Sequence, residues 1–265
     1  MRYQRLTRPT DLVISRSLTL ECYARGENLE LSKVMSRIAE GLEHIDMSIQ
    51  TPQRGRNVDA YHIGIPAMYE KDICKHLIEW WVTNHSDDLK GTNSIDREFP
   101  YPEGGQKCDI VLRSSTYSDD TSWEWAIEIK RIQFIGDNGK NNDYGVGKLL
   151  SPYKKDTSLA GDIVKLQQSA VANKKAVIAY VFNYSFETCE EALKRHPDEK
   201  QVIQALREVC ERNDLKKGEI NAQDLIDVVE YSLKRWGIVI SALKVPFTAW
   251  RSPTGGNGLL FGWQV

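Results

Sequence analysis

The sequence predicts an α/β fold, because helix-like and strand-like patterns of apolar residues alternate along the chain. Apolar residues recur every three or four positions over 31–45 and again over 67–83, as in amphipathic helices. Three short segments, 95–101, 107–113 and 123–134, are typical of strands. A continuous apolar run over 176–184 is typical of a strand that is buried on both faces.

The two N-terminal helices are defined by their apolar stripes. The stripe of the first helix consists of Leu31, Val34, Met35, Ile38, Leu42 and Ile45. The second helix follows Pro66 and buries Ile73, Leu77 and one of two tryptophans. Glu70 falls on this second stripe, where an unpaired carboxylate would be costly. We therefore expect Glu70 either to lie in a frayed first turn or to face a cation.

The later elements follow from capping residues and periodicity. Asp156, Thr157 or Ser158 can cap a helix that runs to about residue 173. Its inward residues are expected to be Leu159, Ile163, Leu166 and Ala170. Further helices are predicted near 186–195, 199–213 and 222–235, and strands over 236–247 and 258–265. Since no repeat or long linker interrupts the chain, we expect one domain over 1–265. Its core would be 66–184, with an N-terminal extension 1–65 and C-terminal elements 185–265.

The sequence argues against a membrane-spanning protein and against a protein that attracts nucleic acid by its overall charge. The 265 residues carry 35 basic and 37 acidic side chains, a net charge of −2, so any nucleic acid must be held by a local basic face or through metal ions. No apolar run approaches the ~20 residues that span a bilayer, and the N-terminus lacks a signal peptide's apolar region. We expect a cytoplasmic protein without membrane contact. The five cysteines are far apart, which favours buried reduced thiols over a zinc site or disulfides.

Two acidic residues are predicted to face each other across a hairpin. If the turn between segments 107–113 and 123–130 is centred between Ser118 and Asp119, Asp109 lies opposite Glu128. Like charges in that position destabilise a sheet, and both acids have apolar neighbours. A divalent cation between the carboxylates would make the pairing tolerable, and oxygen ligands suit Mg²⁺ or Mn²⁺.

Lys130 is expected on the same strand face as Glu128, because side chains alternate along a strand. A metal there would lower the pKa of a bound water and polarise a phosphoryl oxygen, while the lysine orients that water and steadies negative charge. The alternative is a solvated ion pair between Glu128 and Lys130, with Asp109 nearby.

The segments GGQKCDIVL (104–112) and WAIEIK (125–130), within an order of helix, three strands, helix and strand, resemble the PD-(D/E)XK nuclease superfamily. The resemblance covers about 66–184 and implies a restriction-endonuclease-like core, in which helices flank a mixed central β-sheet. It implies Mg²⁺-dependent phosphodiester hydrolysis, with Asp109 and Glu128 as metal ligands and Lys130 near the attacking water. Cys108 stands where the family's name has proline.

The resemblance also suggests a further ligand and a biological role. Glu70 matches the glutamate that many members supply from the preceding helix, and Glu79 is the second choice. We expect a DNA endonuclease of a restriction or defence type, with a homodimer if both DNA strands are cut. The alternative is a catalytically silent module of the same fold that binds nucleic acid or a protein partner.

Contacts with the nucleic-acid backbone are expected around the second core helix and beside the motif. The candidates are Arg131, Lys154, Lys155, Lys165 and Gln167. The N-terminus of that helix could meet a phosphate. The alternative is a simple helix cap with solvated lysines. The chain contains no Walker A, GxSxG or dinucleotide-binding motif, so those chemistries have no support.

Overall fold

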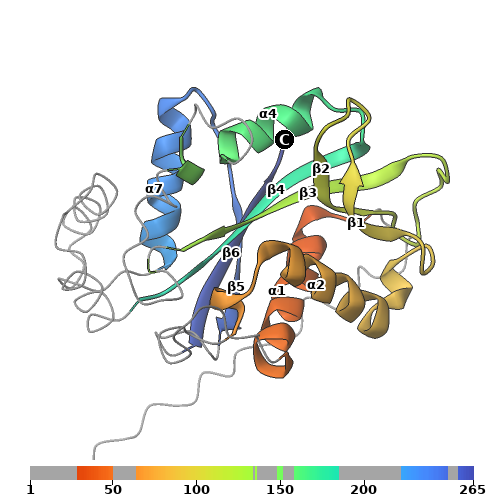
Figure 1. Ribbon diagram of the computed structural model, residues 1–265, viewed down its shortest axis with the longest axis horizontal. Helices are drawn as coiled ribbons and strands as arrows, with labels where there is room; N and C mark the ends of the chain where they lie inside the picture. The colour runs from red at the N-terminus through yellow and green to blue at the C-terminus, as the bar shows by residue number, and fades with distance from the viewer. Residues whose placement is uncertain are drawn as a thin grey trace, which may run out of the picture.

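The chain folds around a central mixed β-sheet that has helices on both faces (Figure 1). Its computed structural model describes residues 29–49, 64–133, 135, 148–151, 158–184, 222–249 and 256–265. The predicted α/β class and the mixed, helix-flanked sheet are confirmed. The predicted helices near 186–195 and 199–213 lie outside the described residues, as do Lys154 and Lys155.

Six strands form the sheet in the order β1-β2-β3-β4-β6-β5. Their bounds are β1 Ile95–Pro100, β2 Lys107–Leu112, β3 Trp123–Ile132, β4 Ala172–Phe182, β5 Leu243–Ala249 and β6 Gly256–Gln264. Strands β3 and β4 are parallel, and every other neighbouring pair is antiparallel. The two central strands are thus β3 and β4, and β4 is buried from Ala176 to Phe182, as its apolar run predicts.

Among the described elements, helices cover both faces of the sheet (Figure 1). Helices α1 (Leu31–Ser48) and α2 (Glu70–Asn84) pack against each other on one face, with α1 over β5 and β6 and α2 over β1, β2 and β3. Helices α4 (Leu159–Gln168) and α7 (Ala222–Arg235) lie on the opposite face, over the central strands and β6. Two short 3-10 turns, η2 (Ile65–Ala67) and η3 (Ser86–Asp88), flank α2. Among the described helices, none combines the length and apolarity that crossing a bilayer requires.

Helix α1 belongs to the same hydrophobic core as the predicted central elements. Every residue of its predicted stripe is buried, and this stripe joins one continuous core cluster with the central strands. The two helices approach closely at Gly41, where a Cβ atom would lie 2.7 Å from Leu77 Cδ2 and 3.0 Å from Trp80 Cε3. The small residue at this crossing allows α2 to lie against α1 and over the sheet.

Helix α2 begins three residues later than predicted, at Glu70. The preceding residues form η2, and their carbonyl groups are engaged elsewhere. Nη1 of the Arg131 guanidinium donates to the carbonyls of Ile65, Pro66 and Met68 at 3.3, 2.6 and 2.6 Å. Because an arginine on β3 holds this turn, the helix starts only beyond it.

Helix α4 begins as predicted but ends earlier. Ser158 caps it by accepting a hydrogen bond from Gly161 N at 3.0 Å. The helix stops at Gln168 because Glu103 binds the next turn, accepting from Ser169 Oγ at 2.8 Å and Ala170 N at 3.1 Å. Ala170 is therefore exposed, and its predicted inward position is wrong.

The strand predicted over 236–247 is also shorter than expected. Residues 236–242 form a turn and an irregular segment, in which Gly237 has a φ of 77°. The backbone reverses there after α7, so strand β5 begins only at Leu243.

Replacing a buried residue of α1 tests whether this helix is integral to the fold. Ile38 is fully buried, so Ile38→Ala should lower the free energy of unfolding by about 2–5 kcal/mol in urea denaturation. Met47→Ala is the control, because Met47 is 55% exposed and its loss should change stability by less than about 0.5 kcal/mol. Equal, small effects of both variants would show that α1 is not part of the cooperative core.

Candidate functional site

The strand pairing predicted for the motif is present in the structure. Strand β2 runs antiparallel to β3 in the register that sets Asp109 opposite Glu128. The β-ladder between these strands ends at the pair Ile110–Ile127, so it stops one residue short of Asp109. The two strands therefore separate at the position of the predicted site.

Beyond that last pair, carboxylates take the place of the missing strand ladder. Ile129 N donates to Asp109 Oδ2 at 2.8 Å, and Arg131 N donates to Glu70 Oε1 at 2.8 Å. Alternate N–H groups of a strand point to the same side, so both of these face the side from which β2 has diverged. Two of the predicted site residues thus cap the open end of β3.

The ladder between β1 and β2 is interrupted at the same residue. Glu98 and Asp109 do not pair in the β-ladder, although the residues on both sides of them do. Glu98 has a φ of 49°, a region that residues other than glycine rarely occupy. Backbone strain of this kind is concentrated at functional sites. Asp109 is therefore without a ladder partner in either of its neighbouring strands.

The three residues of the predicted motif converge on one side of the sheet. Nζ of Lys130 lies 3.7 Å from Glu128 Oε2 and 3.9 Å from Asp109 Oδ2. These are ion-pair distances that exceed direct hydrogen bonds. The arrangement expected from the hairpin register and the strand period is present.

Helix α4 adds two charged side chains that sequence reasoning did not assign to the motif, Asp162 and Lys165. Nζ of Lys165 lies 2.8 Å from Glu128 Oε1 and 2.9 Å from Asp162 Oδ1. Asp162 Oδ2 lies 3.1 Å from Nζ of Lys130, but no described residue makes a hydrogen bond of acceptable geometry to it, so this contact is ionic. We refer to Asp109, Glu128, Lys130, Asp162 and Lys165 as the charge cluster.

Tyr101, just beyond the end of β1, completes the surroundings of Glu128. Its hydroxyl donates to Glu128 Oε1 at 2.6 Å, and Nζ of Lys165 lies 5.1 Å from the centre of its ring. Both Tyr101 and Glu128 are buried. The alternative of a solvated ion pair between Glu128 and Lys130 is therefore wrong.

The charge cluster opens to solvent on the side of Asp109. The exposed fractions of the side chains are 2% for Glu128, 3% for Asp162, 14% for Lys130, 20% for Lys165 and 27% for Asp109. A ligand that approached from solvent would thus meet Asp109 first, with the Glu128 carboxylate behind it.

Burial and repulsion from neighbouring carboxylates shift Glu128 and Asp109 toward their neutral forms. Burial raises the pKa of Glu128 to about 8, and the carboxylates of Asp109 and Asp162 act in the same direction. The two lysines of the cluster oppose this shift without cancelling it. Burial also raises the pKa of Asp109, although Lys130 and the N–H of Ile129 lower it.

The lysines of the charge cluster remain protonated. Burial alone would lower the pKa of Lys130, but the surrounding carboxylates outweigh burial and raise this pKa above its usual range. The pKa of Lys165 is raised for the same reason, chiefly by Glu128 against the effect of burial. Both ammonium groups can therefore donate hydrogen bonds and neutralise negative charge, but neither is a proton acceptor near neutral pH.

The donor set suits a hard divalent cation that also binds water and phosphate. Counting Glu70, four carboxylates face two ammonium groups here, which leaves two excess negative charges when all six groups are ionised. In the described part of the chain, no three His, Cys, Asp or Glu side chains are arranged to surround a metal ion. Mg²⁺ needs no such cage, since it is commonly held by one or two carboxylates together with water and phosphate oxygens. Asp109 and Glu128 fit that pattern, whereas Glu70 Oε1 is engaged by Arg131 N.

The structure separates the predicted nucleic-acid contacts. Lys165 lies inside the charge cluster, whereas Gln167 is exposed on another side of α4. Nη1 of Arg131 holds the η2 turn, so a contact with nucleic acid would have to use the remaining donors of this side chain. Glu79, the second choice for a ligand, is half-exposed and pairs with His76 at 3.1 Å, away from the charge cluster.

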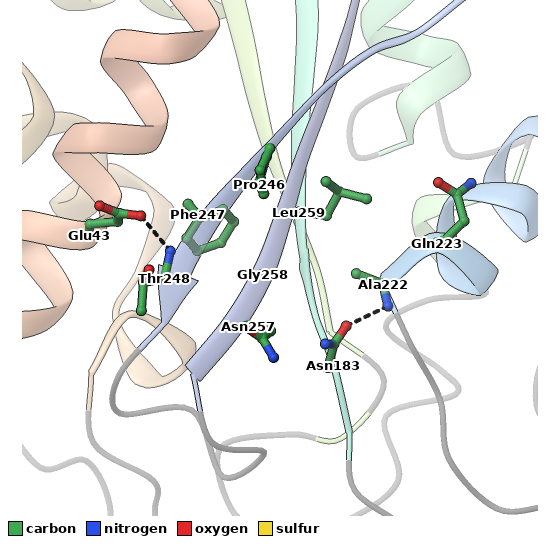
Figure 2. A pocket seen from close by; sticks show the side chains of 10 residues that line it. All are labelled: Glu43, Asn183, Ala222, Gln223, Pro246, Phe247, Thr248, Asn257, Gly258 and Leu259. Carbon is green, nitrogen blue, oxygen red and sulfur yellow. Dashed lines mark hydrogen bonds between the residues drawn. The ribbon is translucent and has the colours of Figure 1, made fainter. Parts of the chain in front are cut away.

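A surface pocket of about 480 Å³ lies elsewhere, lined by residues of α1, β5, β6 and the start of α7 and by Asn183 just after β4 (Figure 2). Glu43 is its one charged lining residue, and the carboxylate accepts a hydrogen bond from Thr248 N at 2.6 Å. Asn183, also in its lining, accepts from Ala222 N at 2.7 Å and so caps α7. These polar groups hold the fold together, and no group of the charge cluster lines this pocket.

Comparison of the chain with protein-family models, with curated proteins and with solved structures finds no match.

The raised pKa of Glu128 predicts how stability depends on pH without metal. The folded protein keeps this proton up to about pH 8, whereas the unfolded chain releases it near the ordinary value of 4.5. Stability should therefore fall as pH rises through this interval, by up to about 1.4 kcal/mol per pH unit. Glu128→Gln should remove this part of the slope, as measured by urea denaturation between about pH 5 and 8 with EDTA. The same slope in both proteins would contradict the assignment.

Proposed function

We propose that the protein is a metal-dependent nuclease that hydrolyses phosphodiester bonds, with DNA as its substrate. The observation that carries this proposal is the convergence of Asp109, Glu128 and Lys130 on one face of β2 and β3. A buried acid, a second acid that is partly exposed and an ammonium group meet there among apolar strands, although a sheet would be more stable without like charges side by side. Such an arrangement is costly for the fold, which favours a role in chemistry.

The order of elements around the site also supports the proposal. Helix α2, strands β1 to β3, helix α4 and strand β4 follow one another as in the core implied by the superfamily resemblance. The motif residues lie on β2 and β3, and α2 begins with Glu70, the residue expected from the preceding helix. A restriction-endonuclease-like fold is therefore the architecture that we propose for the core.

Asp109 and Glu128 would hold a Mg²⁺ ion, for which Mn²⁺ substitutes. Such an ion supplies Lewis-acid polarisation of the scissile phosphate and lowers the pKa of a bound water. The role of Glu70 as a further ligand stays a prediction, because one of its oxygens caps β3. When Glu128 is ionised, the excess negative charge at the site favours a cation, and Mg²⁺ would offset it.

Lys130 would orient the attacking water and stabilise charge that develops on the phosphate. Its raised pKa keeps it an ammonium group, so it acts as a hydrogen-bond donor and a positive charge. Asp162, 3.1 Å away on α4, holds the ammonium group beside the two acids. The incoming phosphate would reach Lys130 from the open side near Asp109.

A silent binding module is the second candidate, and the position of Lys165 favours it. Its ammonium group already neutralises Glu128 from 2.8 Å, so the protein can balance part of the site's charge without a metal. In this reading the charge cluster serves stability, and the protein grips nucleic acid or a protein partner without cleaving it. The restriction or defence setting and a homodimer rest on the resemblance alone.

Cleavage of plasmid DNA tests the enzyme proposal. Wild-type protein with Mg²⁺ should nick or linearise supercoiled plasmid, and EDTA should stop the reaction. Lys130→Met should lower the rate about a hundredfold or more, because it removes a charge that stabilises the transition state. Lys174→Met is the matched control, since Lys174 is also a partly buried sheet lysine in an ion pair, with Glu124 at 3.3 Å. Equal nicking by wild type and Lys130→Met would exclude the assigned site.

Metal-dependent stability separates the enzyme from the silent module. Mn²⁺ at about 100 times its Kd should stabilise the wild type by about 2.7 kcal/mol. Asp109→Asn should lose that stabilisation. Glu124→Gln should keep it, because the Glu124 carboxylate is buried on the same strand as Glu128 but binds Ser114 N and Lys174. A wild type whose stability does not change with Mn²⁺, yet which binds DNA in the presence of EDTA, would favour the silent module.

A further inference from the structure

The two oxygens of Glu128 have different surroundings. Oε1 accepts a hydrogen bond from the Tyr101 hydroxyl at 2.6 Å and lies 2.8 Å from Nζ of Lys165. Oε2 has Nζ of Lys130 at 3.7 Å, which is too long for a hydrogen bond. One oxygen is thus tied to donors, while the other lies toward the lysine that also approaches Asp109.

Tyr101 is held firmly enough to fix its partner. Its N–H donates to Gln106 O at 3.0 Å, and its carbonyl accepts from Gly104 N at 2.9 Å, so the loop between β1 and β2 closes on itself. Glu103 in the same loop binds the end of α4 through Ser169 Oγ at 2.8 Å. Tyr101 as a whole residue is only 4% exposed. The hydroxyl therefore stays at Glu128 because both the loop and the packing hold it.

We propose that Tyr101 is a positioning residue of the candidate nuclease site, which holds Oε1 of Glu128 and thereby directs Oε2 toward Asp109 for metal binding. This inference rests on the proposed function. Partners of this kind fix the orientation of a ligating side chain, and their removal typically lowers metal affinity about 10- to 100-fold. Lys165 holds the same oxygen, but replacing Lys165 would also remove a positive charge from the site. Replacing Tyr101 therefore tests the positioning of Glu128 separately from its charge balance.

The test compares the Mn²⁺ affinity of Tyr101→Phe with that of the wild type by isothermal titration calorimetry. Tyr101→Phe removes one hydroxyl and leaves the charge unchanged, and Mn²⁺ should bind about tenfold more weakly. Tyr180→Phe is the matched control, because the Tyr180 hydroxyl is buried on β4 without a hydrogen-bond partner among the described residues. Its Mn²⁺ affinity should equal that of the wild type.

A second measurement distinguishes positioning from a structural role. In plasmid cleavage, Tyr101→Phe should need about tenfold more Mn²⁺ to reach half its maximal rate, while its rate at saturating Mn²⁺ approaches that of the wild type. Glu103→Ala, which frees the loop from α4, should shift the Mn²⁺ requirement in the same direction by a smaller factor, and it keeps the test open if Tyr101→Phe does not fold.

The outcomes separate this inference from the proposed function. If the wild type binds Mn²⁺ and both Tyr101→Phe and Glu103→Ala bind it equally well, the positioning role is overturned and the nuclease proposal stands. If the wild type itself binds no Mn²⁺ and cleaves no DNA, the proposed function is overturned, and the inference that rests on it falls as well. Weaker binding by Tyr101→Phe, with an unchanged Tyr180→Phe, supports the inference.

Discussion

A carboxylate buried at the centre of the sheet is the constraint on which the site depends. Glu128 lies on β3, one of the two innermost strands, with 2% of its side chain exposed. An ionised acid in that position needs compensation, because its water has been removed. The protein supplies it with the Tyr101 hydroxyl, the lysines on β3 and α4, and a raised pKa that favours the neutral form. Each of these arrangements reduces the free-energy cost of burying the Glu128 carboxylate without eliminating that cost.

The divergence of β2 from β3 gives this buried charge access to solvent. If the ladder continued, Asp109 would be one more residue of a paired strand. Instead, Asp109 and Glu70 accept hydrogen bonds from the β3 N–H groups that β2 leaves unpaired. The strained backbone at Glu98 interrupts the β1–β2 ladder beside Asp109. Both acids therefore stabilise the opened sheet, and Asp109 also lies on the solvent side of Glu128. This double role is why their structural and chemical functions have to be separated by experiment.

The sequence was sufficient to predict those features that depend on residues close to one another in the chain. The stripe of α1, the register around Ile110–Ile127 and a helix cap at one of residues 156–158 all follow from spacing and residue type, and the structure has them, with Ser158 as the cap. Tyr101 could not be assigned, since a tyrosine at a strand end carries no sign of its distant partner. Asp162 left a weak signal, because it lies three residues after Leu159 and four before Leu166, on the buried stripe, as Glu70 does on the stripe of α2. The late start of α2 depends on Arg131, more than 60 residues away in the chain.

The most direct measurement of the central claim is a crystal structure of the protein soaked in Mn²⁺, with anomalous scattering used to locate the metal. We predict an anomalous peak between Asp109 and Glu128, on the solvent side of Glu128, with the Tyr101 hydrogen bond still in place. The account would be contradicted by clear density for these side chains, with the ion pairs of Lys130 and Lys165 intact, and no anomalous peak beside them.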